Sequence, residues 1–262
     1  MQSKTIVFIH GMFMTALCWE KWVPYFQQRG YTCLAPNWPG RDNKPVEELR
    51  ANHPDAQLGQ LGLSDVVNHF ENMIRKLPEK PLLIGHSMGG LVTQLLLQRD
   101  VAAAGVAIDS APPAGVFAPS WSFLKANFPM INPFVPGSAP RCMPFEDFQY
   151  AFVNTLPLAE QQADYARYVV PESRKVPRDS LAGAGAIDFK KAHAPLLMIA
   201  GEKDHIIPAG LNKINYEKYH ASASSSRTDF KEFPGRVHFI IGQKGWEEVA
   251  GYVGEWLSAA SS

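Results

Sequence analysis

Six short β-rich runs, each followed by turn residues and then by a helical pattern, organise the chain. They begin at residues 5, 31, 81, 105, 195 and 228 and read TIVFIHG, YTCLAPNWPG, PLLIGHS, GVAIDSAPP, PLLMIAGEKD and TDFKEFPG. Continuous apolar strands that alternate with helices are typical of a parallel sheet that is buried on both faces. The chain is therefore predicted to be an α/β protein with a mostly parallel central sheet flanked by helices.

Two helical patterns flank the third run. In LSDVVNHFENMIRKLP, apolar residues recur at helical spacing, with Ser64 as the candidate N-cap and Asp65 favourable in the first turn. GGLVTQLLLQRD follows the third run and predicts a second helix, so Ser87 lies at a strand-to-helix junction. The apolar positions of the first helix are Val66, Val67, Phe70, Met73, Ile74 and Leu77.

The junction reads Gly85-His86-Ser87-Met88-Gly89, which is a G-x-S-x-G pattern. In this pattern the serine takes a strained conformation, and the two glycines remove side chains that would collide as the chain reverses from strand into helix. The turn lifts the hydroxyl clear of the backbone, and the N–H groups at the helix start, led by that of Met88, point to where negative charge develops. The alternative is a glycine-rich turn with an incidental serine, but the flanking strand and helix favour a nucleophile.

With this motif the chain resembles the α/β-hydrolase family, specifically its serine esterase and cofactor-free haloperoxidase-like branch, over nearly its whole length. The family's catalytic residues follow in the order nucleophile, acid, histidine. Asp204 lies just beyond the fifth run in PLLMIAGEKDHIIP, and His238 lies in FPGRVHFIIG before a closing helical pattern. The resemblance implies an α/β-hydrolase fold with a catalytic triad of Ser87, Asp204 and His238.

Other residues compete for these roles. Asp109 follows the fourth run, and some members of the family take their carboxylate from that strand end, although we favour Asp204. His86 flanks the nucleophile, but its position on the turn directs it elsewhere, and His205 is interpreted as a loop residue. His238 has the alternative interpretation of a hydrogen-bonded surface histidine.

The loop after the first run, IHGMFM, resembles the family's oxyanion loop through its His10-Gly11 pair. The resemblance implies that the backbone N–H groups of Met12 and Met88 bind the oxyanion together, and one such donor contributes about 3 kcal/mol to transition-state stabilisation. The alternative is that His10 merely anchors a turn.

The second run departs from the family, because APNWPGRDNKP, with Arg41, replaces an acidic, glycine-rich turn. No relative's substrate preference is therefore transferred to this chain.

Residues 113–190 depart from the alternation of strands and helices. The stretch from Pro113 to Tyr150 is rich in proline and aromatic residues and has neither a strand pattern nor a long helical one, whereas LAEQQADYARYVV is helical again. We expect residues 1–112 and 191–262 to form the core and residues 113–190 an inserted cap or lid. Four cap residues predict an apolar substrate pocket or, alternatively, contacts that hold the cap to the core: Trp121, Phe123, Phe128 and Phe134.

Composition argues against several functions. Lys+Arg and Asp+Glu number 25 each, so charge gives no attraction to nucleic acid or to an acidic membrane surface. The apolar run before His10 is too short for a signal peptide or a membrane span, so we expect a cytoplasmic protein. Cys18, Cys33 and Cys142 are odd in number and widely spaced, which predicts buried free thiols instead of a disulfide or a zinc site.

The predicted function is hydrolysis of a small or medium, largely apolar carboxylic ester through an acyl-enzyme. We find no metal-ligand set, dinucleotide fingerprint or phosphate loop in the sequence, and we expect no cofactor. A serine nucleophile argues against dehalogenase and epoxide hydrolase chemistry, which use a carboxylate in this turn. Peracid formation of the haloperoxidase kind and lyase or carbon–carbon bond cleavage are alternatives with the same triad. A ligand-binding receptor on the same fold is a third alternative.

Overall fold

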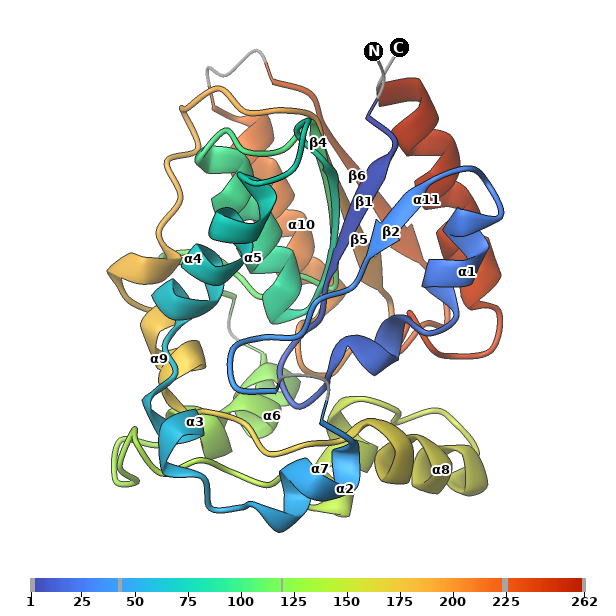
Figure 1. The fold of residues 1–262 in the computed structure, drawn as a ribbon. Coiled ribbons are helices and arrows are strands. Elements are labelled where there is room, and N and C mark those ends of the chain that lie inside the picture. Colours follow the sequence, from blue (N-terminus) through green and yellow to red (C-terminus); the bar gives the residue numbers. More distant parts are fainter. Residues whose placement is uncertain (1–2, 42–43, 119, 223–225, 261–262) are drawn as a thin grey trace.

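The computed structural model describes residues 3–41, 44–118, 120–222 and 226–260, and a single parallel sheet runs through it (Figure 1). Its six strands lie in the order β2-β1-β3-β4-β5-β6, and every neighbouring pair is parallel. Each of the six runs supplies one strand, so the predicted α/β class and parallel sheet are confirmed. The strands are β1 (Thr5–Ile9), β2 (Thr32–Leu34), β3 (Leu82–His86), β4 (Ala104–Ile108), β5 (Leu196–Gly201) and β6 (Thr228–Phe233).

Strand β1 shows why a run in the middle of the sheet is continuously apolar. Ile6 and Phe8 pack into one hydrophobic cluster, whereas Val7 and Ile9 pack into the cluster on the opposite face. This alternation is the period of two that a strand requires. All four side chains are fully buried, so both faces of the sheet need apolar residues.

Helices cover both faces of the sheet (Figure 1). Helices α4, α5 and α10 pack on one face, and α1 and α11 pack on the other. Helix α5 contacts β3 and β4, which places the turn between β3 and α5 in the middle of the sheet. No helix in the described part of the chain is long and apolar enough to cross a bilayer. The bounds are η1 (Ala16–Trp19), α1 (Trp22–Gln27), α4 (Leu63–Ile74), α5 (Met88–Gln98), α10 (Ala209–His220) and α11 (Trp246–Ala260).

Helix α4 begins one residue before the expected N-cap Ser64. Its N-cap is Gly62, and the Asp65 carboxylate accepts the Gly62 N–H at 2.9 Å. Asp179, from a distant segment, accepts the Leu63 N–H at 3.1 Å. Two acidic side chains therefore satisfy two of the N–H groups at the helix start, and Gly62 takes the N-cap position that was expected for Ser64.

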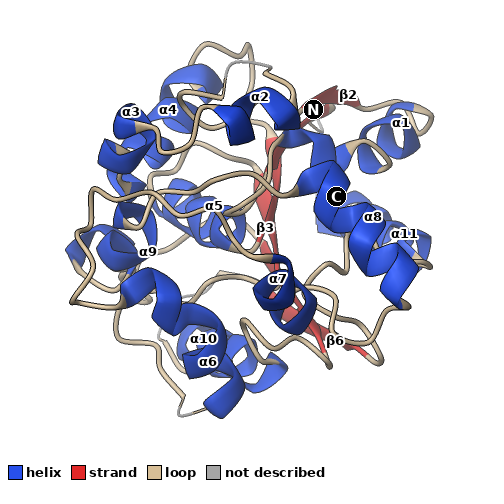
Figure 2. Cartoon of the chain, turned by 90° about the horizontal axis from the view of Figure 1, so that it is seen from below, coloured by secondary structure: helices blue, strands red, loops and turns tan. Residues whose placement is uncertain are grey.

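A second group of helices lies across the carboxyl ends of the strands (Figures 1 and 2). Four of these helices come from residues 113–190, the expected cap, and α2 and α3 from the connection between β2 and α4 lie at the same end. The division into core and cap stays a prediction. The bounds are α2 (Val46–Ala51), α3 (Ala56–Gln60), α6 (Trp121–Ile131), α7 (Phe145–Ala151), α8 (Leu158–Tyr168), α9 (Lys175–Ser180) and η2 (Gly183–Gly185).

Helix α6 lies in the stretch for which the sequence showed no long helical pattern. It runs for 11 residues although Pro129 lies inside it, and the Ser120 hydroxyl accepts the Phe123 N–H at 3.5 Å at its start. Apolar side chains occur on both its exposed and its buried face, so the helix lacks the amphipathic period by which sequence patterns reveal helices. The proline and the missing period explain why this helix was not expected.

Candidate active site

Ser87 lies in a sharp turn between β3 and α5. Its φ and ψ are 58° and −122°, a strained combination for any residue other than glycine. The Ser87 N–H donates to the Ile108 carbonyl at 2.9 Å, and the Ser87 carbonyl accepts the Ala111 N–H at 3.0 Å. These bonds to the end of the neighbouring strand hold the turn in its strained form.

The glycines around this turn are required by close backbone contacts. A Cβ on Gly85 would lie 2.1 Å from the Gly89 carbonyl oxygen, and a Cβ on Gly89 would lie 2.1 Å from the Ile9 carbonyl oxygen. A Cβ on Gly11, in the loop after β1, would lie 2.7 Å from the Ser87 Cβ. The spacing G-x-S-x-G therefore has a steric reason, since α5 and the loop after β1 both pack directly against the turn.

Three residues from distant parts of the chain meet at this edge of the sheet. His238 Nε2 lies 3.0 Å from Ser87 Oγ, and His238 Nδ1 lies 2.6 Å from Asp204 Oδ2. Asp204 comes from the loop after β5, and His238 comes from the loop between β6 and α11. The exposed fractions of Ser87, Asp204 and His238 are 8%, 3% and 0%. The structure thus brings the three residues together in one buried hydrogen-bonded row.

The hydrogen bonds of His238 define its protonation. Burial lowers the pKa of His238 to about 3, so its imidazole is neutral at neutral pH. Asp204 is an acceptor, so the single ring proton lies on Nδ1 and donates to the carboxylate. Nε2 therefore carries a lone pair that accepts the Ser87 hydroxyl, as a general base requires.

A second carboxyl group, that of Asp109, is buried near the row. It follows β4 and has a φ of 44°, and its Oδ1 accepts the Gly201 N–H at 2.6 Å. Burial raises the pKa of Asp109, and the charge of nearby Asp204 raises it further. No hydrogen-bond partner is found for its other oxygen among the described residues.

Asp204 has more hydrogen-bond donors than Asp109. Its Oδ1 accepts the N–H groups of Ile206 and Ile207 at 2.7 and 2.9 Å, in addition to the imidazole on Oδ2. Burial raises the pKa of Asp204, and these backbone donors act against that shift. Because donors stabilise the ionised form of a carboxyl group, these contacts favour Asp204 over Asp109 as the ionised partner of His238.

The other two candidate histidines bind elsewhere. His86 Nε2 donates to the backbone carbonyl of His238 at 2.7 Å, and the two rings lie with their centres 4.8 Å apart. Burial lowers the pKa of His86, so this ring is neutral as well. His205 Nδ1 lies 2.9 Å from the Tyr150 carbonyl oxygen. His86 therefore supports the loop that carries His238, and His205 contacts helix α7.

Among the described residues, one group has metal-ligand atoms close together: His86, Asp109 and His238, within 4.8 Å of one another. Both nitrogens of His238 already face other side chains, and His86 Nε2 is bonded to a carbonyl. A metal ion would have to break these bonds. We therefore assign no metal to this group.

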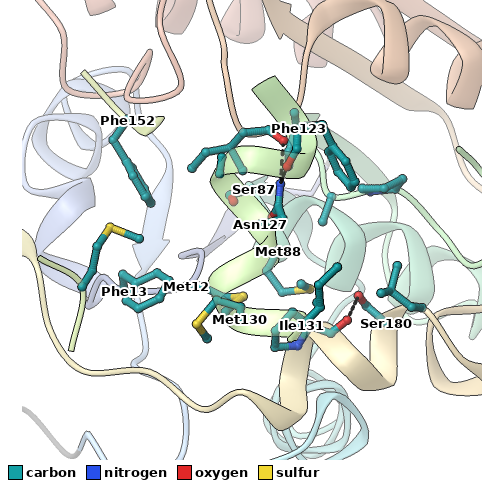
Figure 3. Close-up of a pocket in the computed structure, with 18 residues that line it drawn as sticks. Met12, Phe13, Ser87, Met88, Phe123, Asn127, Met130, Ile131, Phe152 and Ser180 are labelled. Atoms are coloured by element: carbon teal, nitrogen blue, oxygen red, sulfur yellow. Dashed lines mark hydrogen bonds between the residues drawn. The ribbon is translucent and has the colours of Figure 1, made fainter. Parts of the chain in front are cut away.

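Met12 and Met88 line the cavity next to Ser87 (Figure 3). Met88 is the first residue of α5, so its N–H has no partner within the helix. Met12 follows Gly11 in the loop that packs against the Ser87 turn. Two backbone segments that carry the expected oxyanion donors thus flank the Ser87 side chain.

The cavity measures about 70 Å³ and is lined by Ser87 and by residues of helix α6, among them Phe123, Asn127 and Met130 (Figure 3). A water molecule takes about 10–15 Å³ of such space, so the cavity has room for about five waters or a short acyl chain. Its polar side chains are few and already bonded: Asn127 donates to the Phe123 carbonyl at 2.9 Å, and Ser180 donates to the Pro177 carbonyl at 2.8 Å. The apolar lining includes Met12, Met88, Phe123, Ala126, Met130, Ile131, Met143, Phe152, Ile206 and Ile207.

The four aromatic residues expected in the pocket divide into two groups. Phe123 lines the cavity, whereas Trp121, Phe128 and Phe134 do not. The exposed fractions of these three are 77%, 51% and 91%. Helical geometry explains the division along α6, because position 123 faces the core while positions 121 and 128 lie on the opposite side.

Sequence reasoning missed most of the lining. Asn127 and Met130 follow Phe123 at helical spacing, so a correct helix assignment for α6 would have pointed to them. Met143 and Phe152 lie in other segments of residues 113–190 and reach the cavity only through the fold. No local pattern in the sequence identifies such residues.

Comparison with known proteins gives the family of the chain. The sequence profile of the alpha/beta hydrolase family matches residues 6–251. The chain belongs to the alpha/beta hydrolase family. The profile spans the turn of Ser87 as well as Asp204 and His238, so the whole row lies inside the family region. A search of curated protein sequences gives no match.

Solved structures of other proteins share this hydrolase fold along the full chain. A monoacylglycerol lipase of Paleococcus ferrophilus has a TM-score of 0.68 and 20% identity, with 99% of this chain and 96% of that chain covered. A pyrethroid hydrolase from Sphingobium faniae has a TM-score of 0.68 and 17% identity, with 98% of each chain covered. Tomato methylketone synthase I, complexed with 2-tridecanone, has a TM-score of 0.69 and 15% identity, with 99% and 100% covered. At these identities the likeness shows the shared fold.

Proposed function

We propose that the chain is a serine hydrolase that cleaves a small or medium-sized, largely apolar carboxylic ester through an acyl-enzyme. The observation that carries this proposal is the row in which Ser87 Oγ, the His238 imidazole and the Asp204 carboxylate are joined by contacts of 3.0 and 2.6 Å. Nucleophilic catalysis by serine requires such a row. The apolar cavity beside it suits an apolar acyl group, and membership of the alpha/beta hydrolase family supports the reaction class.

In the acylation step, His238 Nε2 takes the hydroxyl proton while Ser87 Oγ attacks the ester carbonyl carbon. Asp204 keeps the imidazole oriented and stabilises the cation that forms. The N–H groups of Met12 and Met88 donate to the oxyanion of the tetrahedral intermediate. When this intermediate collapses, the alcohol leaves with the proton from His238, and the acyl group stays on Ser87.

In the deacylation step, a water molecule attacks the acyl carbon and His238 accepts its proton. The carboxylic acid then leaves, and Ser87 Oγ regains a proton from the imidazole. Because the cavity measures only about 70 Å³, we expect short acyl chains to react faster than long ones.

The experiment that tests this function is turnover of p-nitrophenyl acetate and longer p-nitrophenyl esters by the wild-type protein and by Ser87→Ala. We expect hydrolysis by the wild type and its loss in the variant. Ser180→Ala is the matched control, because Ser180 lines the same cavity but its hydroxyl donates to a backbone carbonyl. Undiminished turnover in Ser87→Ala, or a folded wild type that binds these esters without cleaving them, would contradict the proposal.

A further inference from the structure

Arg41 and Glu172 form an ion pair whose side chains are almost fully buried, with exposed fractions of 2% and 0%. Arg41 comes from the loop after β2, and Glu172 follows α8 near the end of the expected cap. Burying two charges is costly, and their mutual attraction offsets that cost only when further hydrogen bonds satisfy both groups. The partners that supply those bonds therefore indicate what the pair holds in place.

The further bonds converge on the loop that carries Met12. Glu172 Oε2 accepts the Phe13 N–H at 3.0 Å, and Arg41 Nη1 donates to the Met14 carbonyl. Phe13 has a φ of 62°, in the left-handed region that residues other than glycine seldom adopt. The ion pair thus fixes the two residues directly after Met12 in a conformation that the backbone does not favour by itself.

The loop is anchored at other points as well. The Val170 N–H donates to the Phe13 carbonyl at 2.9 Å. His10 Nε2 accepts the Trp38 N–H at 3.1 Å, and its Nδ1 donates to the Gly11 carbonyl at 2.8 Å. Burial lowers the pKa of His10, so the ring stays neutral, as this pattern of one acceptor and one donor requires.

The cap segment holds Glu172 firmly. Its backbone N–H and carbonyl both pair with Arg141, each at 2.8 Å, in a short antiparallel bridge. Its second carboxylate oxygen, Oε1, accepts the Ser173 N–H at 2.8 Å. The carboxylate therefore has a fixed position from which it holds the Phe13 N–H.

We propose that Arg41 and Glu172 are positioning residues that fix the Met12 N–H donor of the oxyanion hole without touching the substrate. The inference rests on the proposed function, because Met12 has this role only when an oxyanion forms at Ser87. Oxyanion donors act over about 2.7–3.1 Å, and a displacement of about 1 Å costs about a hundredfold in rate. Loss of the ion pair frees the peptide that follows Met12 and lets the donor move.

The test compares three variants. Arg41→Met/Glu172→Leu removes both charges, so no unpaired charge stays buried. Glu172→Gln keeps an oxygen that accepts the Phe13 N–H but loses the ion pair. Glu20→Gln is the matched control, because Glu20 also pairs with an arginine across core and cap, Arg167, but binds α8 instead of the loop.

Two readouts separate positioning from a general loss of structure. The first is the division of the effect between kcat and KM for p-nitrophenyl acetate. The second is the inhibition constant of an aryl trifluoromethyl ketone, which forms an oxyanion adduct with a reactive serine, against that of the matching methyl ketone. We expect the double variant to lower kcat about 10- to 100-fold with KM changed less than about threefold.

In the double variant, inhibition by the trifluoromethyl ketone should weaken by the same factor by which kcat falls. The inhibition constant of the methyl ketone should not change. Glu172→Gln should show a smaller effect in the same direction, and Glu20→Gln none. Circular dichroism verifies that each variant is folded. If the double variant does not fold, Glu172→Gln decides the question by the same readouts.

Full kcat in the folded variants would overturn the proposal, and so would an equal weakening of both ketones. These outcomes are distinct from failure of the proposed function. In that case the wild-type protein itself would neither hydrolyse the ester nor react with the trifluoromethyl ketone at Ser87.

Discussion

The carboxyl edge of the sheet and helix α6 hold their side chains very differently. At the sheet edge, Ser87, Asp204 and His238 are at most 8% exposed and lie in one hydrogen-bonded row. On α6, Trp121 and Phe128 are 77% and 51% exposed. Rigid strand ends can hold reacting atoms within a fraction of an ångström, whereas a loosely covered helix can vary in sequence and so adjust selectivity. Substitutions at the sheet edge should therefore affect turnover far more than substitutions on α6.

The largest effect is expected from His238→Ala, which removes the base from the sheet edge. Turnover of p-nitrophenyl acetate should fall by about 10⁴- to 10⁶-fold, because Ser87 then loses its proton acceptor. His205→Ala is the control, since His205 contacts Tyr150 and stands outside the row. Comparable losses in the two variants would refute the assignment of the base.

The next effect distinguishes the two buried carboxyl groups. Asp204→Asn should lower kcat by about 10⁴-fold, because the amide no longer holds the imidazole in the required tautomer. Asp109→Asn changes a carboxyl group that binds the Gly201 N–H and not the imidazole, and the new amide has a similar shape, so this variant should retain most activity. The measurement is kcat for both variants under identical conditions, and the reverse ranking would move the acid to the end of β4.

Gly89→Ala tests how tightly the backbone packs around the Ser87 turn. The new methyl group would lie 2.1 Å from the Ile9 carbonyl oxygen, so the free energy of unfolding in urea should fall by about 1–3 kcal/mol or more. Gly210→Ala is the matched control in α10, because a Cβ there meets no atom within 4 Å. Alanine favours a helix over glycine, so this variant should unfold no more easily than the wild type. Equal destabilisation by both changes would show that the close contact at the Ser87 turn is not the cause.

The smallest effect is expected on α6. Phe123→Ala enlarges the cavity and should increase the rate ratio of p-nitrophenyl octanoate to acetate by about 3- to 10-fold. Trp121→Ala should leave this ratio within about twofold, since Trp121 lies outside the lining. The sequence indicated Trp121 and Phe123 alike as candidates for an apolar pocket, and the structure places only Phe123 in the lining. A larger change of this rate ratio in Trp121→Ala than in Phe123→Ala would contradict the assignment.

The sheet could be predicted from the sequence because its signals are local. Each strand is a short β-rich run followed by turn residues, and the G-x-S-x-G spacing has a steric reason at Gly85 and Gly89. Family order then indicated Asp204 and His238, which the fold brings to Ser87. The exact start of α4 was predicted wrongly, because acidic side chains cap the helix and it begins at Leu63.

The rest of the site depends on contacts that leave no local signal. Helix α6 escaped prediction because Pro129 lies inside it and apolar residues occur all around it. Arg41 was noted only as part of an unusual turn, since its partner Glu172 lies 131 residues away. The choice between Asp109 and Asp204 likewise depended on backbone donors that only the folded chain supplies.

The central claim is that His238 activates Ser87, and phosphonylation by a fluorophosphonate probe followed by peptide mass mapping tests it most directly. We expect a single modification on Ser87 in the wild-type protein, no modification in Ser87→Ala, and labelling slowed at least about a hundredfold in His238→Ala. Modification at another residue, or labelling of His238→Ala at the wild-type rate, would contradict it.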